Sequence, residues 1–301
     1  MHKNKLITGG TGLIGSAFKH GIKVSSQIDL RNPKSTDRLI STHSPSIVIH
    51  TAAKVGGIGA NMNYPADFFM DNIRMNTNVI NSCYLNGVEK LVCFLSTCVF
   101  PDNIEYPLQE DKLELGPPHN SNFAYAYAKR MADVQIQAFN KQYGTKYFSV
   151  IPTNIYGPND NFNLENGHVI PMLIHKCYLA KINNTDFEVW GTGNPLREFI
   201  YSEDVANIVD LLLEKYTDTS PVIISSSYEH SIKEVVDLIV KYMKFDGNII
   251  WRTDKPDGQF RKPSSNAKLK SIIGEYEFTP LEIGLQKTID WFTQNYPNIR
   301  K

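Results

Sequence analysis

Short apolar runs that alternate with longer amphipathic segments are the feature that most constrains the fold of this chain. The runs span residues 5–8, 46–51, 90–96 and 147–151. Nearly continuous apolar runs of this length are typical of parallel strands that are buried on both faces. Residues 67–86 and 125–143 lie between runs and carry apolar side chains at helical spacing. This order predicts an α/β fold with a doubly wound parallel sheet.

A glycine-rich loop joins the first apolar run to a helix expected to begin near Ile14. Gly9, Gly12 and Gly15 are spaced Gly-x-x-Gly-x-x-Gly. Glycine permits the tight turn and the close backbone approach that a dinucleotide pyrophosphate requires. The spacing alone is a weak pattern, because glycines also mark ordinary turns. Its place after the first strand favours a dinucleotide-binding sheet of the Rossmann type.

Besides the glycine loop, three segments with polar side chains follow predicted strands, at residues 52–54, 96–98 and 152–154. Parallel strands place their carboxyl ends at one edge of the sheet, where ligands bind. We therefore expect one crevice there. The expected cofactor contacts near these strand ends are Gly9, Gly12, Leu13, Ile14, Gly15, Ala52, Ala53, Thr153 and Asn154.

The segment that should read the adenosine ribose, residues 21–29, is short. Asp29 and Leu30 are expected to pack beside the adenine. Lys23, Ser25 and Ser26 are candidates to bind a 2′-phosphate, although each is as readily explained as a solvated surface residue. No acidic residue stands clearly at the end of this strand, which favours NADP over NAD.

Tyr125 and Lys129 are four residues apart and share one face of a predicted helix. The lysine charge can lower the pKa of the phenol and make it a proton donor near neutral pH. Ser96, at a strand end, can hydrogen-bond the same substrate oxygen. Tyr-x-x-x-Lys alone is common by chance, but after a glycine loop and this serine it indicates hydride transfer.

Composition excludes some functions and suggests a location. Lys+Arg and Asp+Glu both total 31, so no global charge favours nucleic acid or an anionic membrane as a partner. The four cysteines lack metal-type pairing, and no metal is expected. We see no secretion signal and no membrane-spanning run, so a cytoplasmic protein with free thiols is expected.

The sequence texture changes near residue 157, where Asn and Pro become dense. We expect an NADP-binding Rossmann domain of residues 1–160 and 200–228. A smaller, mixed α/β substrate-binding domain is expected to comprise residues 161–199 and 229–301. Helices are predicted over 172–181 and 202–216, the second with Ser202 as its N-cap. A strand is predicted over 222–225 and a turn over 255–258.

Longer stretches resemble a known family over nearly the whole chain. They lie at residues 52–58, 63–68, 152–158, 160–162, 167–171, 189–193, 197–199 and 255–258. With the glycine loop, Ser96 and Tyr125-x-x-x-Lys129, they resemble the extended short-chain dehydrogenase/reductases, in particular those that act on GDP-linked 4-keto-6-deoxy sugars. Thr11 stands where some members have an arginine, and the segment between Gly15 and Asp29 is shorter than usual.

The resemblance implies two stages of chemistry on GDP-4-keto-6-deoxy-D-mannose. Cys98 and His168 match the family's base and acid for epimerisation at C3 and C5. NADPH then reduces C4 while Tyr125 donates a proton, Lys129 tunes Tyr125 and holds the nicotinamide ribose, and Ser96 stabilises the alkoxide. His168 is also expected beside the cofactor. The pattern alone favours a core position for Cys98 and a structural loop position for His168, and the surrounding motifs reverse that preference.

The resemblance also implies the contacts of a GDP-sugar substrate. Lys176 and Arg197 match cations for the diphosphate. Trp190 packs against guanine or sugar, or else in the core, and Asp257 binds the nucleotide or only shapes its loop. A homodimer through the helices that begin near residues 67 and 125 is expected on the same ground.

Three alternatives remain open. A related nucleotide-sugar epimerase/reductase would form a different sugar product. An NAD-dependent 4,6-dehydratase should carry an Asp-Glu pair where this chain has Cys98 and Val99, and a 4-epimerase needs neither Cys98 nor His168. A non-catalytic dinucleotide sensor typically loses the Tyr or the Lys, and both are present here.

Overall fold

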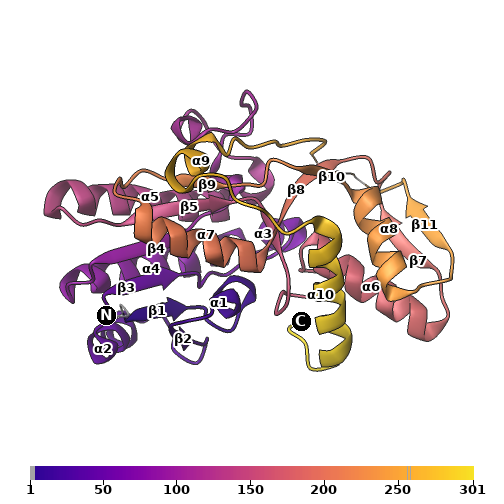
Figure 1. Ribbon diagram of the computed structural model, residues 1–301, viewed down its shortest axis with the longest axis horizontal. Coiled ribbons are helices and arrows are strands. Elements are labelled where there is room, and N and C mark those ends of the chain that lie inside the picture. Colours follow the sequence, from indigo (N-terminus) through magenta and orange to yellow (C-terminus); the bar gives the residue numbers. More distant parts are fainter. Residues whose placement is uncertain (1–3, 256, 258) are drawn as a thin grey trace.

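The protein forms a larger and a smaller lobe, shown at left and right in Figure 1. The structure is a computed structural model that describes residues 4–255, 257 and 259–301. In the larger lobe, six strands form one sheet in the order β2-β1-β3-β4-β5-β9, and every neighbouring pair is parallel. The strands are β1 (Lys5–Thr8), β2 (Ile22–Val24), β3 (Ile47–His50), β4 (Lys90–Phe94), β5 (Phe148–Pro152) and β9 (Val222–Ile224).

Helices cover both faces of this sheet, so it is the doubly wound Rossmann-type fold predicted from the sequence. One face packs on α2 (Pro33–His43), α4 (Pro65–Leu85) and α5 (Phe123–Tyr143). The other packs on α1 (Leu13–Ala17), α7 (Ser202–Lys215) and α9 (Ala267–Ile273). The strand order reverses between β1 and β3, which is where such sheets bind ligands.

The smaller lobe has its own apolar core. Its strands are β6 (Asn154–Tyr156), β7 (Phe187–Trp190), β8 (Leu196–Tyr201), β10 (Glu229–Ser231) and β11 (Ile249–Arg252). They form the sheet β10-β8-β6 and the pair β11-β7. These pack with α6 (Val169–Asn183), α8 (Ile232–Met243) and α10 (Leu281–Asn295). Short helical segments complete the fold: α3 (Ile58–Asn63), η1 (Thr97–Val99), η2 (Glu110–Lys112) and η3 (Asn120–Asn122).

The predicted strands and helices are present within a few residues of their expected ends, but two predictions need correction. Ser202 is not an N-cap: it is the first residue of α7, Tyr201 precedes the helix, and no side chain caps it. Ser202 instead packs against Gly157, whose missing Cβ leaves room for the hydroxyl.

The second correction concerns the domain division. Leu269 and Ile273 of α9 belong to the core under the six-stranded sheet, although residues 229–301 were assigned to the smaller domain. The rest of that division stays a prediction. Of the predicted turn over residues 255–258, Pro256 and Gly258 lie outside the described residues. No helix among the described residues has the length and apolar character needed to cross a membrane.

Candidate active site

A cavity of about 690 Å³ lies at the carboxyl edge of the sheet and is lined by residues of both lobes. The predicted site residues that line it are Gly9, Gly12, Leu13, Ile14, Asp29, Leu30, Ala52, Ala53, Ser96, Tyr125, Thr153, Asn154 and His168. Gly15, Cys98 and Lys129 lie outside the lining, as do the four predicted substrate contacts. Segments that are distant in sequence therefore converge on one crevice, as the parallel sheet requires.

The glycine loop is shaped to hold a dinucleotide. Gly9 has a φ of +67°, and a Cβ there would lie 2.8 Å from the backbone nitrogen of Ala52. A Cβ on Gly15 would overlap the carbonyl oxygen of Gly9. Gly12 differs, because a Cβ there would lie 3.5 Å from Nη1 of Arg300. The loop is thus closed by Gly9 and Gly15, while Gly12 faces a cavity large enough for an extended cofactor.

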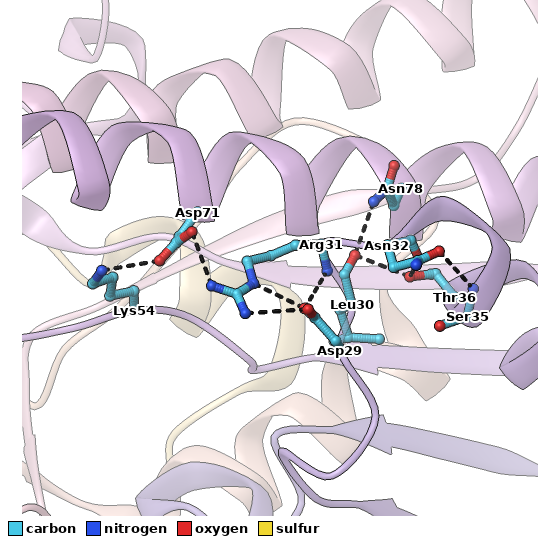
Figure 2. A network of polar contacts seen from close by, with 9 residues as sticks. All are labelled: Asp29, Leu30, Arg31, Asn32, Ser35, Thr36, Lys54, Asp71 and Asn78. Carbon is cyan, nitrogen blue, oxygen red and sulfur yellow. Dashed lines mark hydrogen bonds and ion pairs between the residues drawn. The ribbon is translucent and has the colours of Figure 1, made fainter.

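Figure 2 shows the polar network at the end of this cavity that follows β2. Arg31 Nε donates to Asp29 Oδ1 at 2.9 Å, and Arg31 Nη1 donates to Asp71 Oδ1 at 3.2 Å. Lys54 Nζ donates to Asp71 Oδ2 at 2.9 Å. The hydrogen bonds from Arg31 hold the pKa of Asp29 below its usual range.

Arg31 is a candidate cofactor contact that the sequence analysis missed. It lines the cavity, as do Ser25 and Ser26. Lys23 does not, since its Nζ donates to the carbonyl of Ser16 at 2.7 Å. The available signal was an arginine two residues after Asp29, in the position where NADP-binding sheets carry a cation.

Tyr125 and Lys129 project from α5 beneath the end of β4. Lys129 is buried, its Nζ donates to the Phe94 carbonyl at 2.8 Å, and it lies 5.9 Å from the centre of the Tyr125 ring. Desolvation lowers the pKa of Lys129 to about 8. Burial, with the nearby Cys98, raises the pKa of Tyr125. The direction is opposite to the expected lowering of the Tyr125 pKa, because desolvation is the largest influence on this phenol.

Cys98 lies in η1, which begins three residues after the end of β4, and its N–H donates to Ser96 Oγ at 3.5 Å. The side chain is half-buried, whereas Cys83 and Cys93 are fully buried, which confirms their expected core positions. Burial raises the pKa of the Cys98 thiol, while the Ser96 hydroxyl and the charges of Lys262 and Lys129 oppose that rise. Lys262 was not identified from the sequence.

His168 immediately precedes α6 and faces the cavity from the smaller lobe. Desolvation by the cavity walls lowers its pKa, and the charge of Arg300 lowers it further. Asp160 lines the same region but is 3% exposed. Its Oδ1 accepts the Asn161 N–H at 2.7 Å, and its Oδ2 has no hydrogen-bond partner. Burial raises the pKa of Asp160 to about 7.

A buried hydrogen-bonded chain connects the glycine-loop strand to α5. His50 Nδ1 lies 2.7 Å from Thr8 Oγ1, and His50 Nε2 lies 3.0 Å from Asn76 Oδ1. Asn76 Nδ2 in turn donates to the carbonyl of Ala128 at 3.3 Å. Desolvation lowers the pKa of His50 to about 3, so it is neutral and accepts from Thr8. This chain fixes β1, α4 and α5 together next to Lys129.

The predicted substrate contacts gather in the smaller lobe, away from the cavity lining. Trp190 is 56% exposed, so it is not a core residue. Lys176 Nζ lies 5.0 Å and Lys255 Nζ 5.8 Å from the centre of its rings. Asp257 accepts hydrogen bonds from the N–H and the hydroxyl of Thr192, at 2.6 and 2.8 Å, and so shapes the loop after β7.

Arg197, the other predicted phosphate contact, lies on β8. Its Nη1 donates to the carbonyl of Leu196 at 2.7 Å, and the side chain is half-buried. Desolvation lowers its pKa, and the charges of Asp257 and Tyr106 oppose that change. The cation thus has no paired carboxylate within hydrogen-bond distance among the described residues.

Comparison with known proteins identifies relatives of this chain. The family model of the NAD dependent epimerase/dehydratase family matches residues 5–224. A GDP-L-fucose synthase of Dictyostelium discoideum is 46% identical, with 98% of this chain and 97% of that protein covered. A probable GDP-L-fucose synthase of Drosophila melanogaster is 41% identical, over 99% of this chain and 100% of its own length.

A solved structure has a closely similar fold. The GDP-L-fucose synthetase of Naegleria fowleri bound to NADP superposes with a TM-score of 0.94 at 42% identity. The alignment covers 100% of this chain and 97% of the other. The similarity therefore extends through both lobes.

Proposed function

This chain belongs to the NAD dependent epimerase/dehydratase family, and we propose that it acts there as a GDP-L-fucose synthase. Such an enzyme epimerises GDP-4-keto-6-deoxy-D-mannose at C3 and C5 and then reduces C4 to give GDP-L-fucose. The observation that carries the proposal is the placement of Ser96, Tyr125 and His168 around one cavity, with Cys98 two residues beyond Ser96. The cofactor is NADP(H), and Gly9 and Gly12 of the glycine loop line the same cavity as Arg31.

The reduction is carried by residues of the larger lobe. NADPH, when bound, supplies the hydride that reduces C4. Tyr125 donates a proton to the C4 oxygen, and its burial raises its pKa, which keeps that proton in place until the oxygen becomes basic. Ser96 donates a hydrogen bond to the same oxygen as its charge develops. Lys129 places a positive charge beneath Tyr125, where it stabilises the phenolate that remains.

The epimerisation is carried by Cys98 and His168. The 4-keto group acidifies the hydrogens at C3 and C5, so a base can remove one and form an enolate. Cys98 serves as that base, since the charges of Lys262 and Lys129 favour its thiolate against the cost of burial. His168, on the smaller lobe, returns a proton to the other face. The two residues approach the sugar from different lobes, as inversion of a centre requires.

The nucleotide end of the substrate is assigned to the smaller lobe. We assign the diphosphate to Lys176 and Arg197 and the guanine to the face of Trp190, because two lysine side chains lie near this exposed ring. Asp257 holds the loop that carries Trp190 through its bonds to Thr192. A cytoplasmic location stays a prediction.

A homodimer through α4 and α5 is also part of the proposal. These two helices pack against each other and expose the large apolar side chains of Met70, Phe123 and Val134. Sedimentation of the wild type and of Val134→Lys measures this directly. A wild type that sediments as a monomer at micromolar concentration rules the dimer out.

The function is tested by incubation with GDP-4-keto-6-deoxy-D-mannose and either NADPH or NADH, with the product identified by NMR. We expect GDP-L-fucose, formed faster with NADPH. The UDP-linked sugar, run beside it, tests whether guanine is selected. A product with unchanged configuration at C3 and C5 would instead identify a simple 4-reductase.

A further inference from the structure

The segment that follows α10 returns to the glycine loop of the other lobe, and Figure 1 shows this end of the chain between the two lobes. Tyr296 and Ile299 pack against the core of the smaller lobe. The carbonyl of Arg300 accepts the N–H of Phe162 at 2.9 Å. The backbone at Arg300 is therefore anchored on the smaller lobe, while its side chain lines the cavity.

The guanidinium of Arg300 lies over the glycine loop. Its Nη1 is 3.5 Å from the position that a Cβ on Gly12 would occupy. In dinucleotide-binding sheets, the backbone of this loop approaches the pyrophosphate closely. Residues 9–15 themselves contain no Lys or Arg, so the loop offers the pyrophosphate backbone N–H groups and no charge of its own.

Arg300 also differs from the other cations of the cavity. The lining contains the cationic side chains Arg31, Lys54 and Arg300. Arg31 and Lys54 are paired with Asp71, and Arg31 also with Asp29. Among the described residues, none of the recorded ion pairs includes Arg300.

The carboxyl whose pKa Arg300 lowers, Asp160, forms no ion pair with the Arg300 guanidinium among the described residues. Burial raises the pKa of Asp160 to about 7, and Arg300 opposes that rise only in part. Oδ2 of this carboxyl has no hydrogen-bond partner among the residues that the structure describes. The positive charge of Arg300 is therefore available to a bound anion.

We propose that Arg300 binds the pyrophosphate of NADP(H) from across the cavity and so links the smaller lobe to the glycine loop of the larger one. The ligand class is a dinucleotide diphosphate, and the proposal rests on the cofactor assigned above. A guanidinium suits this position because it can donate two parallel hydrogen bonds to phosphate oxygens. The residue contacts the cofactor without taking part in proton transfer.

Calorimetric titration of the enzyme without substrate tests this contact. NADP⁺ is titrated into wild type, Arg300→Met, Arg300→Lys and the matched control Lys301→Met, which removes the neighbouring charge. Lys301 Nζ lies 5.0 Å from the centre of the Tyr296 ring, on the smaller lobe. We expect Arg300→Met to weaken binding roughly 10- to 100-fold, as for a hydrogen bond to a charged group. Arg300→Lys should recover part of the affinity, and Lys301→Met should match wild type.

Adenosine 2′-phosphate, which lacks the pyrophosphate, serves as the second probe. Its affinity should be the same for Arg300→Met and wild type, and the melting temperatures without ligand should also agree. Wild-type affinity of Arg300→Met for NADP⁺, or an equal loss for both probes, would overturn the proposal. A wild type that binds neither probe would instead refute the assigned cofactor, so the two failures are distinguishable.

Discussion

The two lobes present their functional side chains in different ways. In the larger lobe, Gly9, Ala52, Ser96 and Thr153 come within two residues of the ends of neighbouring parallel strands, so the sheet itself places them at one edge. In the smaller lobe, His168 comes from the start of a helix, and other contacts come from loops and from the segment after α10. Regular backbone geometry therefore positions the cofactor-binding residues of the larger lobe. The site residues of the smaller lobe depend instead on packing between segments that are distant in sequence.

The arginines illustrate the same contrast. Arg31, on the larger lobe, is held by Asp29 and Asp71, and its pKa is raised by those hydrogen bonds. Arg300 reaches the cavity from the opposite side with no carboxylate among its recorded partners. Arg31 is thus already held in an ion-pair network at one position along the cavity, whereas the charge of Arg300 at another position is available to a ligand. Reduction is assigned to residues of the larger lobe, and epimerisation to residues of both lobes. Substitutions should therefore be able to stop one reaction without the other.

The sharpest separation is expected for Tyr125→Phe. Removal of the phenol proton should lower reduction of C4 roughly 100- to 10,000-fold, the usual range for a general acid. Exchange of solvent deuterium into C3 and C5, followed by NMR, should continue because Cys98 and His168 are intact. Loss of both reactions would show that the two halves are not separable.

The reciprocal change is Cys98→Ser. A serine hydroxyl is a much weaker acid than a thiol, so we expect deuterium exchange at C3 and C5 to fall by roughly 100-fold or more. NADPH titration should give the wild-type affinity, since Cys98 does not line the cofactor cavity. The control is Cys83→Ser in the core, which should reduce stability rather than separate the reactions. Normal exchange in Cys98→Ser would remove Cys98 from the mechanism.

Asp160 lines the cavity that both lobes form, and Asp160→Asn should change how the free energy of unfolding depends on pH. The pKa of Asp160 is about 7 in the folded protein and 3.8 for a solvated aspartate, so folding favours the protonated form. This contribution is complete below pH 4 and is lost as pH rises through 7. By pH 8 the variant should gain up to roughly 4 kcal/mol relative to wild type, compared with pH 4. Denaturant unfolding at both pH values measures this, and parallel pH profiles would contradict it.

The smallest effect is expected for Arg31→Leu. Loss of this cation should reduce the preference for NADP⁺ over NAD⁺ roughly tenfold, because only NADP⁺ carries a 2′-phosphate. Lys23→Leu is the control, since the Lys23 side chain donates to Ser16 and does not line the cavity. The ratio of the two dissociation constants is the measurement. A greater loss in the Lys23 variant would reverse the assignment.

Prediction from the sequence succeeded where the determinants are local. The strand before the glycine loop and the helix that carries both Tyr125 and Lys129 are present as expected, and each depends only on a few neighbouring residues. It failed for the pKa of Tyr125, because that value depends on how completely the surrounding chain removes water. It also missed Arg31, whose partner Asp71 lies forty residues further along the chain, in α4.

The sequence by itself determined the alternation of strands and helices, the doubly wound sheet and the residues at its carboxyl edge. These follow from apolar periodicity and from the few connections that a parallel sheet permits. Only the tertiary structure decided that Trp190 is exposed near two lysines, that Asp160 is buried with an unpartnered oxygen, and that Arg300 lies over Gly12. Those outcomes depend on desolvation and on contacts between distant segments, which no local pattern encodes.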